Sequence, residues 1–319
     1  MTEELIYHYT SFDKFKCILE NGTLRFKEST KSNDILDTTL LFDVLRNYKG
    51  LPDCRDVVEV ARKFMLDYYQ GFEAQNQHIS LVACFAKTGD SRMLWDAYTM
   101  NRPSNIKCMH GEKRYCYDSN VRYNGVCIAF DSKKLNEHMQ RHAGKVYERA
   151  YLCPIIYGID KAKEQLNCWF EEACEQVHVL RQEPDQSQDI IKQMVITGVS
   201  GRPLISMDLK KCLVIPMVEL IGKIDAFSPF FKHEFWSDEA EVRASLCFHK
   251  NKASAQVNNA DDYMYFDMPI TMECIDHIIL GPEFSEEDKK EIMSHAEYKL
   301  NFETLLKRTS VGTGVIRGK

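Results

Sequence analysis

Long apolar segments are absent from this sequence. The longest uninterrupted apolar run, Leu81–Ala86, is far too short to cross a membrane. The first five residues carry neither a basic start nor an apolar stretch, so we expect no export signal. A net charge of -6 and a pI near 6.0 exclude a general excess of positive charge for coating membranes or nucleic acid, although a local basic groove stays possible. These absences predict a cytoplasmic protein with no membrane partner.

The common nucleotide and nucleophile motifs are also missing. The sequence has no G-x-x-x-x-G-K-[ST], and no G-x-G-x-x-G lies between a strand and a helix. Gly312-Thr-Gly314 lies near the chain end with no strand before it. G-x-S-x-G and H-E-x-x-H are absent as well. P-loop, dinucleotide-fingerprint, serine-hydrolase and zincin classes are therefore not indicated.

Twelve cysteines are present, but no tight pair has zinc-finger spacing. Cys108 and Cys116 lie eight positions apart, and His138 and His142 share only one helical face. We therefore expect no metal site. With no export signal, the cysteines are expected to be reduced, buried thiols and not a disulfide framework. Most sit inside apolar runs, for example Cys17, Cys84, Cys127, Cys212 and Cys274.

The pattern of apolar residues predicts one α+β domain over residues 1–319. Apolar residues make up 44% and charged residues 28%, which is typical of a globular chain. Short strands are predicted at Leu5–Thr10, Leu24–Phe26, Ile79–Ala86, Gly125–Phe130 and Ile275–Leu280. We expect these to form a mixed sheet, with a helical segment at residues 38–71 and a mostly helical insertion or cap at residues 131–222. Regular alternation of strands and helices, as in a doubly wound sheet, is not seen.

The segment Trp236–Leu246 carries the most distinctive charge pattern. Read as a strand, it places Glu239, Glu241 and Arg243 on one face and small apolar residues on the other. We expect a hairpin to continue from it to residues 263–268. The charged face looks into either a polar cleft or solvent. A helix with Glu239 and Arg243 as an i,i+4 pair is the alternative.

Two further segments combine polar and aromatic residues beside predicted strands. Tyr7-His8-Tyr9-Thr10 ends a strand where a helix begins, a position suited to an anionic or ribose-bearing ligand. Thr10 as a simple helix cap and His8 as a half-buried strand residue are the alternative. In residues 90–98, Trp95 and Tyr98 lie three apart on a helix, either as core residues or as a stacking surface for a flat ring.

These motifs together resemble a mainly bacterial family known as domain-of-unknown-function family 2971. The similar segments are Leu5–Thr10, Ile18–Leu24, Ser32–Asp34, Cys84-Phe85, Met93–Tyr98, Gly125–Asp131, Trp236–Arg243 and Ile278–Pro282. They follow one another in order over most of the chain. The loop at residues 101–124 and the helical insertion after Asp131 depart from the pattern.

The strand ending in His-Tyr-Thr and the helix ending in Asn-Gly also resemble the opening of ADP-ribosyltransferase-like folds. That resemblance implies NAD as a substrate, with His8 contacting its ribose and Glu241 or Glu239 acting beside the nicotinamide ribose. The other ligand contacts that it implies, including stacking and pyrophosphate-binding roles, fall to Tyr9, Thr10, Arg25, Arg92, Trp95, Tyr98 and Arg243.

Three functions remain open from the sequence. The first is an NAD-dependent ADP-ribosyltransferase-like enzyme that modifies a macromolecule, such as nucleic acid or protein, or hydrolyses NAD. The resemblance places such enzymes among toxins and phage-defence effectors. The second is a non-catalytic sensor that binds a nucleotide or partner. The third is a metal-dependent nuclease with oxygen ligands from Asp34, Asp37, Glu239 and Glu241. The oligomeric state is not predicted.

Overall fold

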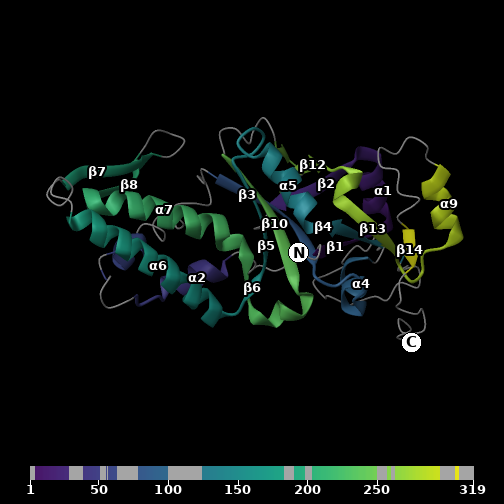
Figure 1. Ribbon diagram of the computed structural model, residues 1–319, viewed down its shortest axis with the longest axis horizontal. Coiled ribbons are helices and arrows are strands. Elements are labelled where there is room, and N and C mark those ends of the chain that lie inside the picture. The colour runs from purple at the N-terminus through teal and green to yellow at the C-terminus, as the bar shows by residue number, and fades with distance from the viewer. Residues whose placement is uncertain are drawn as a thin grey trace, which may run out of the picture.

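A mostly antiparallel open sheet organises the chain (Figure 1). The computed structural model describes residues 4–28, 39–50, 55, 57–62, 78–99, 124–182, 190–197, 203–249, 257–259, 263–294 and 306–308. The strands are β1 (Leu5–Thr10), β2 (Thr23–Glu28), β3 (His78–Ala86), β4 (Val126–Asp131), β5 (Arg149–Pro154), β6 (Ile156–Tyr157), β7 (Ile190–Thr197), β8 (Pro203–Lys210), β9 (Phe231–Lys232), β10 (Glu241–His249), β11 (Asn258–Asn259), β12 (Met264–Pro269), β13 (Ile275–Leu280) and β14 (Leu306–Arg308). The helices are α1 (Phe12–Asn21), α2 (Leu40–Arg46), α4 (Arg92–Tyr98), α5 (Ser132–His142), α6 (Ile159–Gln182), α7 (Lys211–Phe227) and α9 (Glu286–Ser294), with 3₁₀ turns η3 (Ser228–Phe230), η4 (Glu234–Glu239) and η5 (Met272–Cys274).

The sheet runs in the order β11-β12-β2-β3-β1-β4-β13-β14, and β10 joins β3 to β5 off this path. The β13–β14 pair is parallel, so the sheet is mixed, as predicted. The predicted hairpin from β10 to residues 263–268 was wrong, because β12 pairs with β2. Each strand has two edges, and both edges of β10 are occupied by β3 and β5. The fold class α+β is confirmed.

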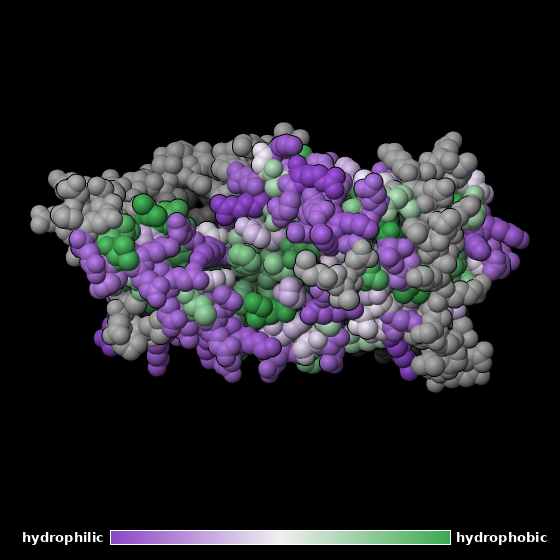
Figure 2. Space-filling view, in the orientation of Figure 1, coloured by the Kyte–Doolittle hydropathy of each residue, from purple (hydrophilic) through white to green (hydrophobic). Residues whose placement is uncertain are grey.

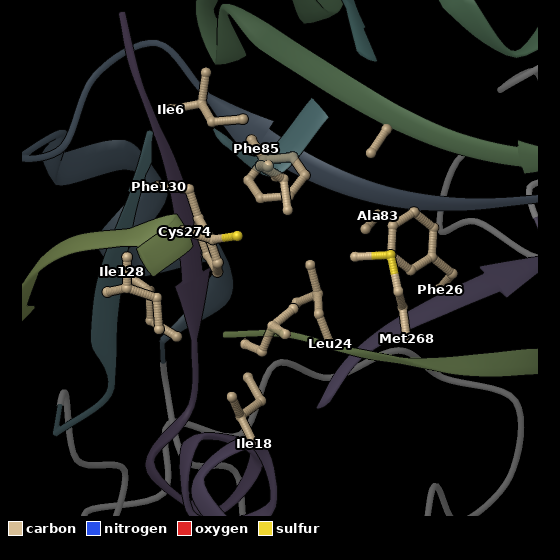
Figure 3. Close-up of a cluster of buried hydrophobic side chains, with 14 of the residues drawn as sticks. Ile6, Ile18, Leu24, Phe26, Ala83, Phe85, Ile128, Phe130, Met268 and Cys274 are labelled. Atoms are coloured by element: carbon tan, nitrogen blue, oxygen red, sulfur yellow. The ribbon is translucent and has the colours of Figure 1, made fainter. Parts of the chain in front are cut away.

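Alternating apolar residues of the central strands form the main core (Figure 3). Ile6, Phe85 and Phe130 project into it from β1, β3 and β4. Helix α1 covers this face, and its residues Phe12, Phe15, Ile18 and Leu19 are buried at helical spacing. The helix ends where Gly22 adopts φ 62° and its N–H bonds to the Ile18 carbonyl at 2.8 Å. This turn directs the chain straight into β2.

A second apolar core lies between α2, α6 and α7, at the left of Figure 1. Leu41 of α2, Phe170 of α6 and Ile224 of α7 are fully buried within it. The interpretation of residues 131–222 as mostly helical holds only in part. Strand β5 belongs to the main sheet, α5 packs on the main core, and β7 and β8 form an antiparallel pair. Alternation over the short β7 and β8 strands is too weak a signal to distinguish them from helix.

Some apolar side chains of this helical lobe stay exposed (Figure 2). Val179 on α6 is 60% exposed, and Ile215 and Val218 on α7 are 56% and 53% exposed. Among the described residues, none of the helices combines the length and the apolar character that a membrane crossing requires.

The cysteines differ from the sequence expectation in part. Cys127 and Cys274 are buried thiols, as predicted, whereas Cys17 and Cys84 are exposed. Cys174 on α6 is disulfide-bonded, so the prediction of reduced thiols was wrong there. Cys108 and Cys116 lie outside the described residues.

Candidate functional site

An opening in the sheet creates the cavity at which most of the predicted site residues meet. Strand β1 pairs with β3 through Tyr7 and Ala86, whereas β2 pairs with β3 through Lys27–Val82 and Glu28–Leu81. Between these pairings, the edge of β3 near Cys84 has no registered partner strand among the described residues. A cavity of about 560 Å³ occupies this opening and is lined by Val82–Ala86 of β3. Ligand cavities of proteins span about 300–1,000 Å³.

Strand register decides which side chains share a face of the sheet here. Tyr7, Ala86 and Glu241 lie in one row across β1, β3 and β10, so they point to the same face. His8 follows Tyr7 and points to the other face, where its ring lies 5.7 Å from the Phe85 ring. The cavity touches both His8 and Glu241, because β1 and β2 diverge at this point.

The His8 ring is held in one tautomer by the backbone. Its Nδ1 lies 2.9 Å from the Cys84 carbonyl oxygen, which can only accept, so Nδ1 carries the proton. Among the described residues Nε2 has no hydrogen-bond partner, and in the neutral ring it is an acceptor. Burial lowers the pKa of His8, and the charges of Lys14 and Lys27 lower it further, against the opposing effect of the Cys84 bond. His8 is therefore a neutral acceptor for a hydroxyl group near pH 7.

We expect Lys14→Gln to raise the pKa of His8, because it removes a positive charge that disfavours the imidazolium form. The titration of the His8 Hε1 resonance by NMR measures this. Lys133→Gln on α5 removes the same charge away from the cavity and should leave the His8 midpoint unchanged. An unchanged midpoint in Lys14→Gln would show that the ammonium does not act on the ring.

A buried ion-pair network forms another wall of the cavity. Arg243 is fully buried and binds Glu241 through Nε–Oε1 at 2.8 Å and Nη2–Oε2 at 3.1 Å. Lys232 of β9 binds the same carboxylate at 2.9 Å. Burial alone would raise the pKa of Glu241, but Arg243 and Lys232, with a bond from the Cys84 thiol, lower it overall. Glu241 is therefore an ionised anchor with two cations.

Glu239 reaches the same network from a different element. It lies at the end of η4, so its predicted position on the strand was wrong. Ala240 adopts φ 44°, and this left-handed residue turns the chain between Glu239 and the strand. Lys232 Nζ binds Glu239 Oε2 at 2.9 Å, and the Tyr98 hydroxyl donates to its Oε1 at 2.6 Å. Burial and this carboxylate raise the pKa of Tyr98, so Tyr98 stays protonated as a donor.

Trp95 and Arg92 do not reach the cavity wall. The Trp95 side chain is fully buried, its Nε1 donates to Asp90 at 2.8 Å, and its ring packs edge-on to Tyr9 at 5.1 Å. A buried ring has no face free for a ligand, so the stacking interpretation of Trp95 was wrong. Tyr98, three residues later, is 42% exposed and lines the cavity instead.

The remaining predicted residues line the cavity, but their contacts limit what they do. The Tyr9 hydroxyl donates to the Thr88 carbonyl at 2.9 Å and accepts from the Ser91 N–H, so it fixes the loop before α4. Arg25 binds Asp267 through two bonds of 2.7 and 2.8 Å, which neutralises its charge. Thr10 is buried at the end of β1.

Sequence reasoning missed several residues that the structure places in this cavity. Lys232, Lys14, Lys27 and Trp236 all line it. A signal existed for Lys232, since it follows the buried pair Phe230-Phe231, where a charge needs a partner. Lys14 lies on α1 and Lys27 on β2, both at exposed positions. Nothing in their local sequence distinguishes them from other surface lysines.

The predicted absence of a metal site is not tested by this structure. His138 Nε2 lies 2.8 Å from the Pro269 carbonyl oxygen and His142 Nδ1 lies 2.9 Å from that of His138, so each ring has a backbone partner. Within the described ranges no group of three or more His, Cys, Asp or Glu side chains is placed to hold a metal. Asp34 and Asp37 lie outside those ranges.

Fold and site together define an α+β protein with a ligand-sized cavity at an opening of its sheet. The chain matches the model of a family described as protein of unknown function (DUF2971) over residues 113–244, which confirms the family predicted from the motifs. The match includes Lys232, Glu239, Glu241 and Arg243 but not His8. The match also spans residues 131–222. No curated protein and no solved structure matches the chain.

Proposed function

We propose that the chain is an ADP-ribosyltransferase-like enzyme that consumes NAD. The observation that carries this proposal is the common cavity of His8, near the start of the chain, and Glu239 and Glu241, far along it. The resemblance of the opening segment implies this pairing of a strand histidine with a later glutamate. A cavity that runs through an opening in a sheet also suits an elongated ligand such as a dinucleotide.

The reaction breaks the bond between the ribose carbon and the nicotinamide nitrogen, and the bonding electron pair leaves with nicotinamide. Positive charge develops on the ribose carbon, and the Glu239 carboxylate stabilises it. A water or an acceptor group of a macromolecule, such as nucleic acid or protein, then bonds to that carbon and loses a proton. Neutral His8 accepts a hydrogen bond from a ribose hydroxyl through Nε2, which positions the substrate.

Glu239 is the better placed of the two carboxylates for this role. Its side chain is 12% exposed, against 5% for Glu241. Among the residues that the structure describes, Lys232 is the one cation that binds Glu239, whereas Lys232 and Arg243 both bind Glu241. We assign to Glu239 the stabilisation of the positive charge that develops on the ribose carbon. Glu241 positions Glu239 through Lys232, which binds both carboxylates.

A non-catalytic nucleotide-binding module is the second candidate. Lys232 and Arg243 balance the charges of Glu239 and Glu241 within the network, which weakens the field that a developing cation would experience. Such a cavity would bind a nucleotide without breaking it. The nuclease alternative has no comparable observation in its favour.

One assay separates these functions. The full-length chain is incubated with NAD labelled in the nicotinamide ring or the adenine, with DNA or protein acceptors, with and without EDTA. Nicotinamide release, with adenine label appearing on an acceptor or as free ADP-ribose, supports the enzyme, and its loss in a folded His8→Ala variant ties it to this cavity. Binding of NAD without release supports the binding module. Nucleic-acid cleavage that EDTA abolishes supports the nuclease.

A further inference from the structure

Within the described part of the chain, two lysines of the cavity wall have no carboxylate partner. Every other arginine or lysine of this wall has one. Arg25 pairs with Asp267, Arg243 with Glu241, and Lys232 with both glutamates of the network. Lys14 of α1 has no ion pair or hydrogen bond among the described residues. Lys27 of β2 lies 5.2 Å from the centre of the Tyr263 ring and likewise has no anionic partner there.

The charges of these two lysines act on the same small region. Lys27 lowers the pKa of Lys14, after the larger effect of burial, and both lysines lower the pKa of His8. Lys14, Lys27 and His8 all line the one cavity, so they form a basic cluster in which the charges of the two lysines repel each other. A bound anion would relieve this repulsion.

A single residue of β3 connects this basic cluster to the acidic network. The Cys84 carbonyl bonds to His8. The Cys84 thiol acts on the Glu241 carboxylate and contributes to the lowering of its pKa. Lys14, Lys27, Glu239 and Tyr98 all line this cavity, so one ligand can contact both the lysines and the acidic network. This arrangement matches a molecule with phosphate groups at one end and an uncharged or cationic group at the other.

We propose that Lys14 and Lys27 bind the diphosphate group of a nucleotide ligand. Two ammonium groups match the two negative charges of a diphosphate, and the neighbouring His8 Nε2 is left to accept from an adjoining ribose hydroxyl. The roles suggested for Arg25 and Arg92 pass to these lysines, because Asp267 already neutralises Arg25 and Arg92 is not part of the cavity wall. The choice of NAD as the nucleotide rests on the proposed function, whereas the diphosphate site itself does not.

Calorimetric titration of the full-length chain with ADP-ribose, inorganic pyrophosphate and adenosine tests this. We expect ADP-ribose and pyrophosphate to bind, and added salt to weaken both. Lys14→Gln and Lys27→Gln should each weaken ADP-ribose binding about 10-fold, the usual scale for a hydrogen bond to a charged group. Adenosine affinity should not change in these variants. Lys133→Gln, which removes a charge outside the cavity, should bind all probes like the wild type.

The outcomes separate this inference from the enzymatic proposal. Equal ADP-ribose affinity in wild type and in the Lys14→Gln/Lys27→Gln double variant overturns the diphosphate site, as does a wild type that binds neither phosphorylated probe. If NAD is hydrolysed with an unchanged KM in the double variant, the enzyme stands and this site is wrong. If the lysines are needed for ADP-ribose binding but no nicotinamide is released, the site stands and the enzymatic proposal fails.

Discussion

Glu241→Ala should destabilise the folded protein by about 3–5 kcal/mol, because it leaves the fully buried Arg243 guanidinium without its carboxylate. The bond from Arg243 Nη1 to the Pro229 carbonyl at 2.6 Å does not replace the carboxylate, because a carbonyl carries no net charge. Urea unfolding followed by circular dichroism measures the free energy of unfolding. Glu239→Gln, in the same network but with a side chain that is 12% exposed, should cost only about 1 kcal/mol.

A double variant separates the effect of breaking the Glu241–Arg243 ion pair from the effect of removing the volume of the Glu241 side chain. Glu241→Met with Arg243→Met removes both charges and should be more stable than Glu241→Ala, since no buried charge is left unpaired. A Glu241→Ala variant that unfolds at the wild-type urea concentration yet loses all nicotinamide release would contradict the anchoring role. Glu241 itself would then be the carboxylate that contacts substrate.

The dependence of stability on pH tests the same role of Glu241. The folded-state pKa of Glu241 lies below the ordinary value of 4.5. Its ionised form therefore stabilises the fold at pH values above 4.5, and this contribution is lost as the pH falls through the folded-state pKa. The Glu241→Met/Arg243→Met variant should lose less stability than the wild type between neutral and acid pH.

Glu239→Gln should lower the turnover of NAD by about 10²–10³-fold while the protein stays folded. The amide keeps the size of the side chain but not the charge that stabilises the developing ribose cation. The amide oxygen can still accept from Lys232, and the amide NH2 can donate to the Tyr98 hydroxyl oxygen, so the cavity wall should keep its shape. Nicotinamide release under saturating NAD measures the effect on kcat, and the binding of ADP-ribose reports whether the cavity is intact.

The neighbouring carboxylate of Asp238 offers a matched control. It lies on the same 3₁₀ turn, is exposed and is not part of the cavity wall. Asp238→Asn should therefore keep wild-type turnover. If Glu239→Gln and Asp238→Asn retain equal activity, Glu239 does not act on the substrate.

Several features of the fold could be predicted because they depend on local pattern. Strands β1 and β13 coincide with their predicted ranges, and α1 ends at the predicted Asn21-Gly22. The alternation after residue 240 correctly places Glu241 and Arg243 on the face opposite Val242, Ala244 and Leu246, which pack in the main apolar core. A strand alternates its faces whatever it pairs with, so this much is readable from sequence.

The candidate site could be predicted only in part. His8, Glu239 and Glu241 were correctly placed on one cavity, but Trp95 was taken for a ligand-facing ring. Trp95 and Tyr98 lie three positions apart on one helix, and the sequence alone does not show which of the two rings is buried. Only the contacts of Trp95 with Tyr9 and Asp90 show that its ring is the covered one. Arg25 was similarly misjudged, because Asp267 lies far away in the chain.

The sequence by itself therefore determined the α+β class, the family, most strand positions and the face on which Glu241 and Arg243 lie. Tertiary structure alone decided that β10 pairs with β3 and β5, that the sheet opens between β1 and β2, and which cations are neutralised. The physical reason is that a charged side chain or a strand edge interacts with whichever partner the folded chain brings near it, and that partner can be far away in the sequence. For Arg25 and Lys232 a carboxylate came within reach, and for Lys14 and Lys27 none did among the described residues.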